Sequence, residues 1–225
     1  MDDNLLLIKI GGGDQINLAA IADDLAELSV PIIIVHGANG LRDRLSKQLG
    51  YKRNTLKSLS GYSSVYSDND LIDLQMMAYS GVRNKRIVEL LQTRGINAIG
   101  LSGLDGQLIR GRRNRGIKIR EGEKKKLIRD LSGKAEAINT GLLATLLEMG
   151  MAPVLTIPIL DEQGIAINSE NDDIVALLQK SMNIRTVIHL IESGGFLRDP
   201  EDPNSIVPNM DQSTLIRWEA EADGR

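Results

Sequence analysis

Short apolar segments alternate along the chain with longer segments in which apolar residues recur every three or four positions. Residues 5–10 and 31–35 are of the first kind, and residues 17–28 and 41–49 are of the second. Continuously apolar short runs are typical of strands buried on both faces of a parallel sheet, whereas the longer spacing is typical of amphipathic helices. The alternation therefore predicts βαβ units around a mainly parallel central sheet.

Three further apolar runs extend this pattern, at residues 98–101, 154–160 and 187–191. We expect them to be strands that are also buried on both faces. Residues 70–94 predict one long helix that crosses the core, because apolar side chains recur in it at spacings of mainly three and four. Residues 135–149 predict another helix, which a following glycine ends. The fold class is therefore α/β, with helices on both faces of the sheet.

The pattern changes between residues 107 and 129, where short alternating segments are separated by Gly111, Gly116 and Gly122. This arrangement is typical of antiparallel hairpins and predicts a protruding sheet or lid. Residues 199–209 contain three prolines and predict an irregular loop.

The composition narrows the kinds of site that the chain can hold. It has no cysteine and only two histidines, His36 and His189, so we expect no disulfide, no thiolate chemistry and no metal site built from these side chains. The first residues are acidic and Lys9 interrupts the first apolar run. We therefore expect neither a signal peptide nor a membrane span, and a cytoplasmic protein.

Positive charge is concentrated in one part of the chain. The formal net charge is −3, yet residues 110–129 hold ten lysines and arginines against two glutamates. The segment has no aromatic residue on which a base would stack, so we do not expect a nucleic acid as the partner. The alternatives are an acidic protein partner and a solvated hairpin face.

The first candidate site consists of Lys9, Gly11, Gly12 and Gly13, which follow the first predicted strand. Glycines allow close backbone approach, and consecutive amides beside an ammonium group form a nest that suits phosphate. The spacing matches neither the Walker loop nor the dinucleotide-binding fingerprint. A plain glycine turn is the alternative explanation.

Two more polar segments follow predicted strands. Residues 36–40, with the sequence His-Gly-Ala-Asn-Gly, offer a second set of amides before a helix. Residues 168–173 precede another helix, and their amides and carboxylates are able to bind a substrate, orient Lys9 or hold magnesium. Helix capping by Ser169 or Asn171 is the alternative. All three segments are expected at one edge of the sheet, where α/β proteins place their sites.

These landmarks resemble the amino acid kinase family, which shares Lys-Ile/Val-Gly-Gly on the first strand, His-Gly-Gly on the second and a later Asn-x-(Asn/Asp)-x-Asp. The order matches over nearly the whole chain. Residues 97–113 look like the acetylglutamate kinases. The Gly-Arg-Arg that ends this run, the basic hairpin after it and the sequence of residues 130–139 look most like the [LysW]-aminoadipate and [LysW]-glutamate kinases.

The resemblance implies a three-layer αβα sandwich of the carbamate kinase kind with a hairpin lid at residues 107–129. It places the acceptor-substrate half at residues 1–160 and the start of the nucleotide-binding half at residues 161–225. Family members continue beyond the position of Arg225 into a helix with a second catalytic lysine, so we expect the nucleotide-binding half to be incomplete here.

The implied reaction is the ATP-dependent phosphorylation of a side-chain carboxylate, with Mg²⁺, in lysine or arginine biosynthesis. The acceptor is 2-aminoadipate or glutamate bound to an acidic carrier protein, LysW, and the protein is expected to be a homodimer. Two alternatives remain: a kinase that uses free N-acetylglutamate, and a noncatalytic module that binds an acidic partner.

The resemblance also assigns roles to single residues. Lys9 and Asp172 are the catalytic pair, in which Asp172 orients the lysine, and Gly11, Gly12 and Gly13 hold phosphate with Lys9. The substrate-binding residues are Gly37, Ala38, Val65 and Asn168, and the carrier-docking residues are Arg110, Arg112, Arg113 and Arg115.

Two of these positions depart from the family pattern. Ala38 replaces the second glycine of His-Gly-Gly, and Val65 stands where the family has an arginine that grips the α-carboxylate of the acceptor. Loss of a bidentate, charge-assisted contact weakens binding strongly. Arg53 and Arg83 are the nearby arginines that would compensate.

Overall fold

The computed structural model describes residues 4–52, 54–57, 63–121, 124–199 and 201–221. The chain divides into two compact units, residues 1–190 and residues 191–225. Each unit is described by itself. No helix in the described ranges is long and apolar enough to cross a membrane.

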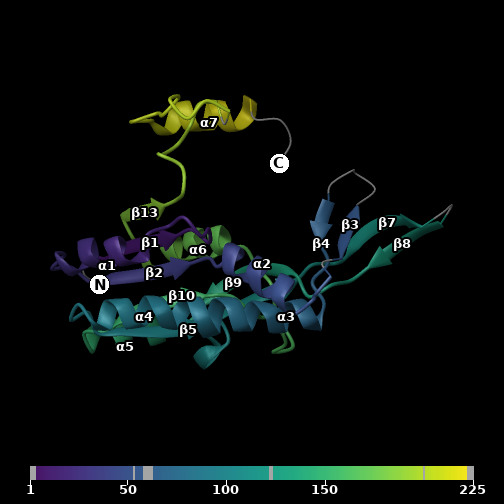
Figure 1. Ribbon diagram of the computed structural model, residues 1–225, viewed down its shortest axis with the longest axis horizontal. Coiled ribbons are helices and arrows are strands. Elements are labelled where there is room, and N and C mark those ends of the chain that lie inside the picture. The colour runs from purple at the N-terminus through teal and green to yellow at the C-terminus, as the bar shows by residue number, and fades with distance from the viewer. Residues whose placement is uncertain (1–3, 53, 58–62, 122–123, 200, 222–225) are drawn as a thin grey trace. The chain divides into compact units, whose positions relative to one another are not determined.

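A five-stranded sheet forms the centre of the first unit (Figure 1). In spatial order its strands are β13 (Thr186–Leu190), β1 (Leu6–Ile10), β2 (Ile32–His36), β10 (Ala152–Thr156) and β5 (Ala98–Ser102). Every pair of neighbouring strands is parallel. The predicted central parallel sheet is therefore confirmed.

Two core clusters lie on the two faces of this sheet. Leu7 and Ile33 belong to one cluster, and their neighbours Ile8 and Ile34 belong to the other, as the alternation of side chains along a strand requires. The helices α1 (Leu18–Ala26) and α4 (Asn84–Gln92) contribute to the cluster of Ile8, and α5 (Thr140–Glu148) and α6 (Asn171–Met182) to the cluster of Leu7. These three layers confirm the αβα sandwich.

The apolar run at residues 154–160 was predicted to be one strand, but the structure divides it between two strands. It divides at Pro158, which has no N–H group to continue a ladder, and Ile159–Leu160 (β11) joins a second sheet. That sheet has the order β12-β11-β6-β9, with β12 at Ala166–Ile167, β6 at Ile109–Arg113 and β9 at Gly133–Ile138.

The helix predicted at residues 135–149 begins later than expected. Residues 133–138 form strand β9, because they pair with β6 along its whole length. The side chain of Asn139 then accepts a hydrogen bond of 3.1 Å from the N–H of Leu142 and caps α5. The prediction of helix at 135–138 was wrong, since pairing with a distant strand outweighed local propensity.

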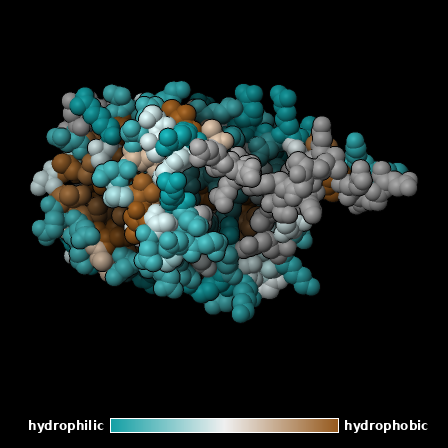
Figure 2. Space-filling view, turned by 90° about the horizontal axis from the view of Figure 1, so that it is seen from above, coloured by the Kyte–Doolittle hydropathy of each residue, from teal (hydrophilic) through white to brown (hydrophobic). Residues whose placement is uncertain are grey.

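The prediction that residues 187–191 are buried on both faces was also wrong. These residues form most of β13, which is an edge strand, and few side chains lie over its faces. Ile188 is 38% exposed. In the view of Figure 2, hydrophobic residues gather toward the left of the surface and are bordered by hydrophilic ones.

Two β-hairpins project from one end of the first unit (Figure 1). One consists of β7 (Ile117–Glu121) and β8 (Lys124–Ile128), and the other of β3 (Thr55–Lys57) and β4 (Ser63–Val65); both are antiparallel. The antiparallel hairpin predicted within residues 107–129 is thus present.

Residues 69–92 form one continuous helical run, as predicted for residues 70–94, but its middle is not α-helical. α3 (Asn69–Gln75) passes into a π-helical segment at Met76–Arg83, and α4 follows directly. The wider turns of a π-helix insert extra residues between the two α-helices. A short 3₁₀ turn at Asp105–Gln107 and helix α2 (Asn39–Gln48) complete the first unit.

The second unit contains helix α7 (Gln212–Glu221) and a bridge between Leu197 and Ile206. The ring of Phe196 stacks on that of Trp218 with centroids 6.0 Å apart, and the Arg198 guanidinium lies 5.3 Å from the Trp218 centroid. The described part of residues 199–209 forms no helix and no strand beyond that bridge, as the prolines predict.

His36 lies fully buried at the end of β2 and joins three elements. Its Nδ1 lies 3.1 Å from the carbonyl oxygen of Gly37, which only accepts, so Nδ1 carries the proton. Nε2 then accepts from the Asn84 amide at 3.1 Å, and the same amide donates to Val154 O at 2.9 Å. Burial lowers the pKa of His36 to about 4. The imidazole is therefore neutral and structural.

We predict that His36 makes the stability of the fold sensitive to acid. In the unfolded chain His36 takes up a proton near its ordinary pKa of about 6.5, but in the folded chain only near 4. The unfolded state thus binds more protons in this window, and the free energy of unfolding falls by up to about 3 kcal/mol as the pH drops through it.

Urea unfolding of the wild type and of His36→Gln at pH 7.5 and pH 4.5 measures this contribution. The variant should lose that part of the pH dependence, whereas His189→Gln, on the exposed surface of β13, should keep it. Equal pH dependence in wild type and His36→Gln would contradict the assignment.

Candidate active site

Two glycine loops meet at the carboxyl ends of β1 and β2. The N–H of Gly37 donates to Ile10 O and the N–H of Gly40 donates to Gly12 O, both at 2.9 Å. A Cβ atom on Gly12 would lie 2.6 Å from the backbone nitrogen of Asn39, and one on Gly37 would lie 2.9 Å from the nitrogen of Gly12. Only glycine allows the two backbones to approach this closely.

Backbone amides from both loops are available to bind an anion. Within the described ranges, the N–H groups of Gly12, Gly13 and Asn39 donate no hydrogen bond. Asn39 is also the first residue of α2, where the helix dipole favours negative charge. The Gly11 amide, which the resemblance assigned to phosphate, donates to Leu190 O at 2.9 Å and so serves the sheet instead.

Lys9 stands beside these loops and pairs with the third predicted segment. Its Nζ lies 3.0 Å from Oδ1 of Asp172 in the first turn of α6, and its side chain is only 15% exposed. Asp172 is 68% exposed, so the ion pair contributes little to stability, but it fixes the position of the ammonium group. Lys9 and Asp172, predicted to act together, are therefore in direct contact.

The π-helical segment forms a further wall of the site, which the sequence did not predict. The Tyr79 hydroxyl is hydrogen-bonded to Asn39 Oδ1, and Arg83 donates to Gly13 O at 3.4 Å. Burial raises the pKa of Tyr79, so it keeps its proton. The apolar spacing in the sequence does not mark this segment, because Val82 near its end is 46% exposed and belongs to neither core cluster.

The polar residues around Asn168 do not cap α6. The residue at the N-cap position is Glu170, and it makes no side-chain capping bond. In the described part of the chain, Ser169 Oγ and Asn171 Oδ1 are buried without a hydrogen-bond partner. Asn168 Oδ1 instead accepts a hydrogen bond of 2.9 Å from Gln75 Nε2 in α3, a residue that the sequence did not single out.

Of the two residues that depart from the family pattern, the structure describes the side chain of Ala38 but not that of Val65. Ala38 is fully buried and its methyl group belongs to a core cluster. Val65 is the last residue of β4, but its side chain lies outside the described residues, as does Arg53. Arg83 contacts the first glycine loop.

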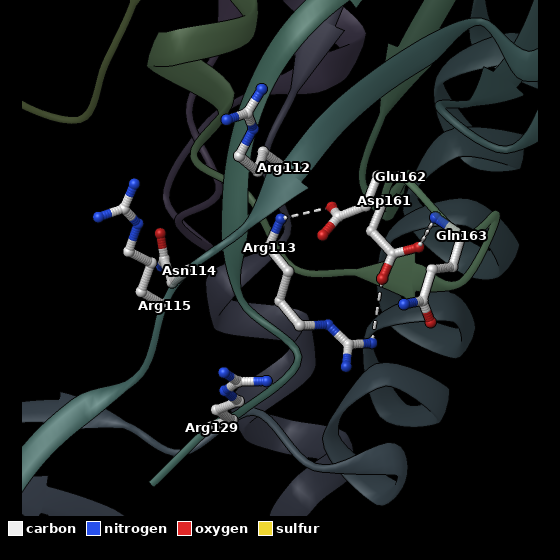
Figure 3. A pocket seen from close by; sticks show the side chains of 8 residues that line it. All are labelled: Arg112, Arg113, Asn114, Arg115, Arg129, Asp161, Glu162 and Gln163. Carbon is white, nitrogen blue, oxygen red and sulfur yellow. Dashed lines mark hydrogen bonds and ion pairs between the residues drawn. The ribbon is translucent and has the colours of Figure 1, made fainter. Parts of the chain in front are cut away.

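A basic pocket of about 230 Å³ lies near the base of the β7–β8 hairpin (Figure 3). It is lined by Arg112, Arg113, Asn114, Arg115, Arg129, Asp161, Glu162 and Gln163. Three of the four predicted carrier-docking arginines thus come together. The fourth, Arg110, lines a separate hollow of about 530 Å³ with Gly106 and Asn139.

Arg113 is held in this pocket by an acidic turn. The guanidinium of Arg113 lies 3.1 Å from Oδ2 of Asp161, whose side chain is 2% exposed. The backbone N–H of Arg113 donates to Oε2 of Glu162 at 3.1 Å. The other oxygen of Asp161 accepts from the N–H groups of Gln163 and Ile165, both at 2.8 Å. No pattern in the sequence predicts this contact, because the turn reaches Arg113 through the pairing of β11 with β6.

No group of three or more acidic, histidine or cysteine side chains within the described residues is placed to hold a metal ion. The site as a whole combines free backbone amides, one positioned ammonium group and a set of polar side chains at the carboxyl edge of a parallel sheet. That combination defines a phosphate-binding α/β protein.

Comparison with known proteins specifies the family. Residues 4–224 match the amino acid kinase family. The [LysW]-aminoadipate kinase of Thermus thermophilus is 39% identical over 207 residues, or 90% of this chain and 77% of that protein. The acetylglutamate kinase of Bacteroides thetaiotaomicron is 29% identical over 98% of this chain and 83% of that protein. A carbamate kinase from Giardia has the same fold, with a TM-score of 0.64 at 10% identity over 99% of this chain and 84% of that one.

The chain belongs to the amino acid kinase family. This confirms the resemblance that Lys9, the glycine loops and residues 97–113 indicated. It also confirms the expectation of a phosphotransferase with a carboxyl group as acceptor, and ATP is the phosphate donor that the family implies.

We predict that Gly12→Ala destabilises the fold by about 1–3 kcal/mol, because the new methyl group would overlap the backbone of Asn39 and Ala38 and push the loops apart. Gly141→Ala in α5 is the matched control, since its Cβ would meet only the Asn139 side chain at an ordinary 3.6 Å. The control should gain up to about 1 kcal/mol. Equal stability of the two variants in urea unfolding would show that the loops do not require the close approach.

Proposed function

We propose that this protein phosphorylates the side-chain carboxylate of 2-aminoadipate or glutamate bound to an acidic carrier protein. The observation that carries the proposal is the meeting of Lys9, the free amides of the two glycine loops and the Asn168–Asp172 segment at one edge of the sheet. Relatives with the name [LysW]-aminoadipate kinase, at 38% and 39% identity, support this choice of acceptor.

The residues at this edge suit phosphoryl transfer to a carboxylate. A carboxylate oxygen is already nucleophilic, so no general base is needed, and the buried neutral His36 is not one. ATP supplies the phosphoryl group: a bond forms from the carboxylate oxygen to the γ-phosphorus, the bond to the β–γ bridging oxygen breaks, and ADP leaves. Lys9 and the amides of Gly12, Gly13 and Asn39 would compensate the charge of the phosphate oxygens, while Asp172 keeps Lys9 in place.

Several further parts of this proposal follow from the sequence and from the family resemblance. Mg²⁺ is expected to be bound mainly through phosphate oxygens, because the described side chains form no metal cluster. The place in lysine or arginine biosynthesis, the cytoplasmic location, the homodimer and the division into an acceptor half (1–160) and a nucleotide half (161–225) stay predictions.

The basic pocket is the part of the chain that suits an acidic carrier. Opposite surface charge speeds and orients protein association. Arg112 and Arg115 lie on the pocket wall, and Asp161 binds Arg113 from inside the protein. The pocket therefore presents a net positive surface whose one partly buried arginine is already in position.

The phosphoryl transfer is tested by trapping acyl phosphate as hydroxamate, with ATP, magnesium and either the carrier-bound acceptor or free N-acetylglutamate. Lys9→Met should lower the rate by about 10²–10³-fold, because it removes a charge aimed at the transferred group. Lys47→Met, an exposed lysine in α2, is the control and should not change the rate.

The three candidate functions give different results in this assay. Turnover of carrier-bound substrate alone supports the proposal, and turnover of free N-acetylglutamate alone favours an acetylglutamate kinase. If wild type and Lys9→Met both bind the carrier but neither acceptor yields acyl phosphate, the kinase proposal is wrong and the noncatalytic binding module is favoured.

Docking is tested separately with the double variant Arg112→Glu/Arg115→Glu, which spares the Arg113–Asp161 pair. Its affinity for the carrier should fall at least about tenfold, and the loss should shrink at high salt because the attraction is electrostatic. Lys180→Glu/Lys47→Glu makes the same change in net charge outside the pocket and should cost much less affinity. Equal losses in both double variants would assign the effect to net charge.

A further inference from the structure

Gln75 is a polar residue that is buried in the acceptor half, although one of its polar atoms has no partner there. It is the last residue of α3 and is 1% exposed. Its Nε2 donates to Asn168 Oδ1 at 2.9 Å, but its own Oε1 is buried and accepts no hydrogen bond from the described residues. Nor does Asn168 Nδ2 donate to any group in the described ranges. The two hydrogen-bonded amides therefore retain one acceptor atom and one donor group without a partner in the described ranges.

Three backbone N–H groups at or next to Asn168 and Leu131 are already used. The N–H of Leu131 donates to Ser67 O and the N–H of Asn168 donates to Leu131 O, both at 2.7 Å, and the N–H of Gly133 donates to Asn168 O at 2.9 Å. A buried amide oxygen without a donor destabilises the folded state. An apolar side chain of similar size would fill the same space without that cost.

The bond between the two amides fixes what each offers to a ligand. Because Asn168 Oδ1 is occupied by Gln75, the Asn168 amide turns its N–H groups outward, which suits a carboxylate. Gln75 Oε1 suits an N–H donor. A neutral N–H fits this neutral oxygen, whereas a buried ammonium group would require a carboxylate partner. An N-acyl amino acid has both matching groups on its α-carbon: the α-carboxylate is the acceptor for Asn168, and the α N–H is the donor for Gln75.

We infer that Gln75 is a specificity-determining residue of the acceptor site: its Oε1 receives the α N–H of an N-acylated amino acid while it holds the Asn168 amide toward the α-carboxylate. This inference rests on the proposed function, because it takes the acceptor to be an acylated amino acid. The orientation of Asn168 matters more in this chain than in relatives with the acceptor arginine, since Val65 has no charge with which to grip the carboxylate.

The test compares two probes that differ in one atom. N-acetyl-L-2-aminoadipate has the α N–H, and 2-acetoxyadipate has an ester oxygen in its place. Calorimetric titration of the full chain should show about tenfold tighter binding of the amide, because a buried site built to accept a hydrogen bond rejects an analogue without the donor. Gln75→Met should reduce this preference to about one. Gln48→Met, at the exposed end of α2, should keep it.

A purely structural role for Gln75 predicts a different result. Gln75→Met would then lower the free energy of unfolding without ligand and leave the amide-to-ester ratio unchanged. If the inference holds, the ligand-free variant is at least as stable as the wild type, because an unpaired buried oxygen has been removed. Where the free probes bind too weakly, the same ratio is taken from KM values of the carrier-bound amide and its ester-linked counterpart.

Failure of the inference and failure of the proposed function are distinguishable. Equal binding of amide and ester by the wild type, in a protein that forms acyl phosphate, overturns the role of Gln75 and leaves the kinase intact. Absence of both acyl phosphate and probe binding overturns the two together. An unchanged preference in Gln75→Met assigns the N–H to another acceptor and overturns the inference alone.

Discussion

Gly12 and Gly37 lie so close together that a Cβ atom on either would meet backbone atoms of the opposite loop. This contact exists because β1 and β2 are adjacent and parallel, so that their carboxyl ends reach the same edge of the sheet. It brings the amides of two separate loops to one place, with Lys9 beside them at the end of β1. Tyr79 then meets the second loop, and Asp172 reaches Lys9 from α6. The other parts of the site are arranged around this backbone contact.

The features that the sequence predicts well are those that depend on local pattern. Buried parallel strands require continuous apolar runs, so most of the central sheet was visible in the sequence. The meeting of Lys9 with Asp172 was also predictable, although they are far apart in the chain. The family resemblance predicted it, whereas the rule for parallel strands does not explain it, because residues 168–173 follow β12, which pairs antiparallel with β11 in the second sheet.

The features that the sequence did not predict depend on partners from distant parts of the chain. β9 is a strand because β6 lies beside it, whereas the local pattern of residues 135–138 predicts the start of a helix. Arg129 was counted among the basic residues, but its place in a pocket with Asp161 follows from the pairing of β11 with β6. Gln75 looked like an ordinary polar position in a helix. Its burial beside Asn168 became visible only when α3 and the residues before α6 were in place.

The π-helical segment lets one continuous helix serve two differently oriented neighbours. Before it, Gln75 reaches Asn168, and after it, Asn84 reaches His36 and Val154. Each residue of an α-helix turns the chain by about 100°, so removal of a single residue from this segment would rotate α3 against α4 by roughly that angle. Either Gln75 or Asn84 would then lose its neighbours. The length of this segment is thus fixed by the angle between two contacts, whatever side chains it carries on its outer surface.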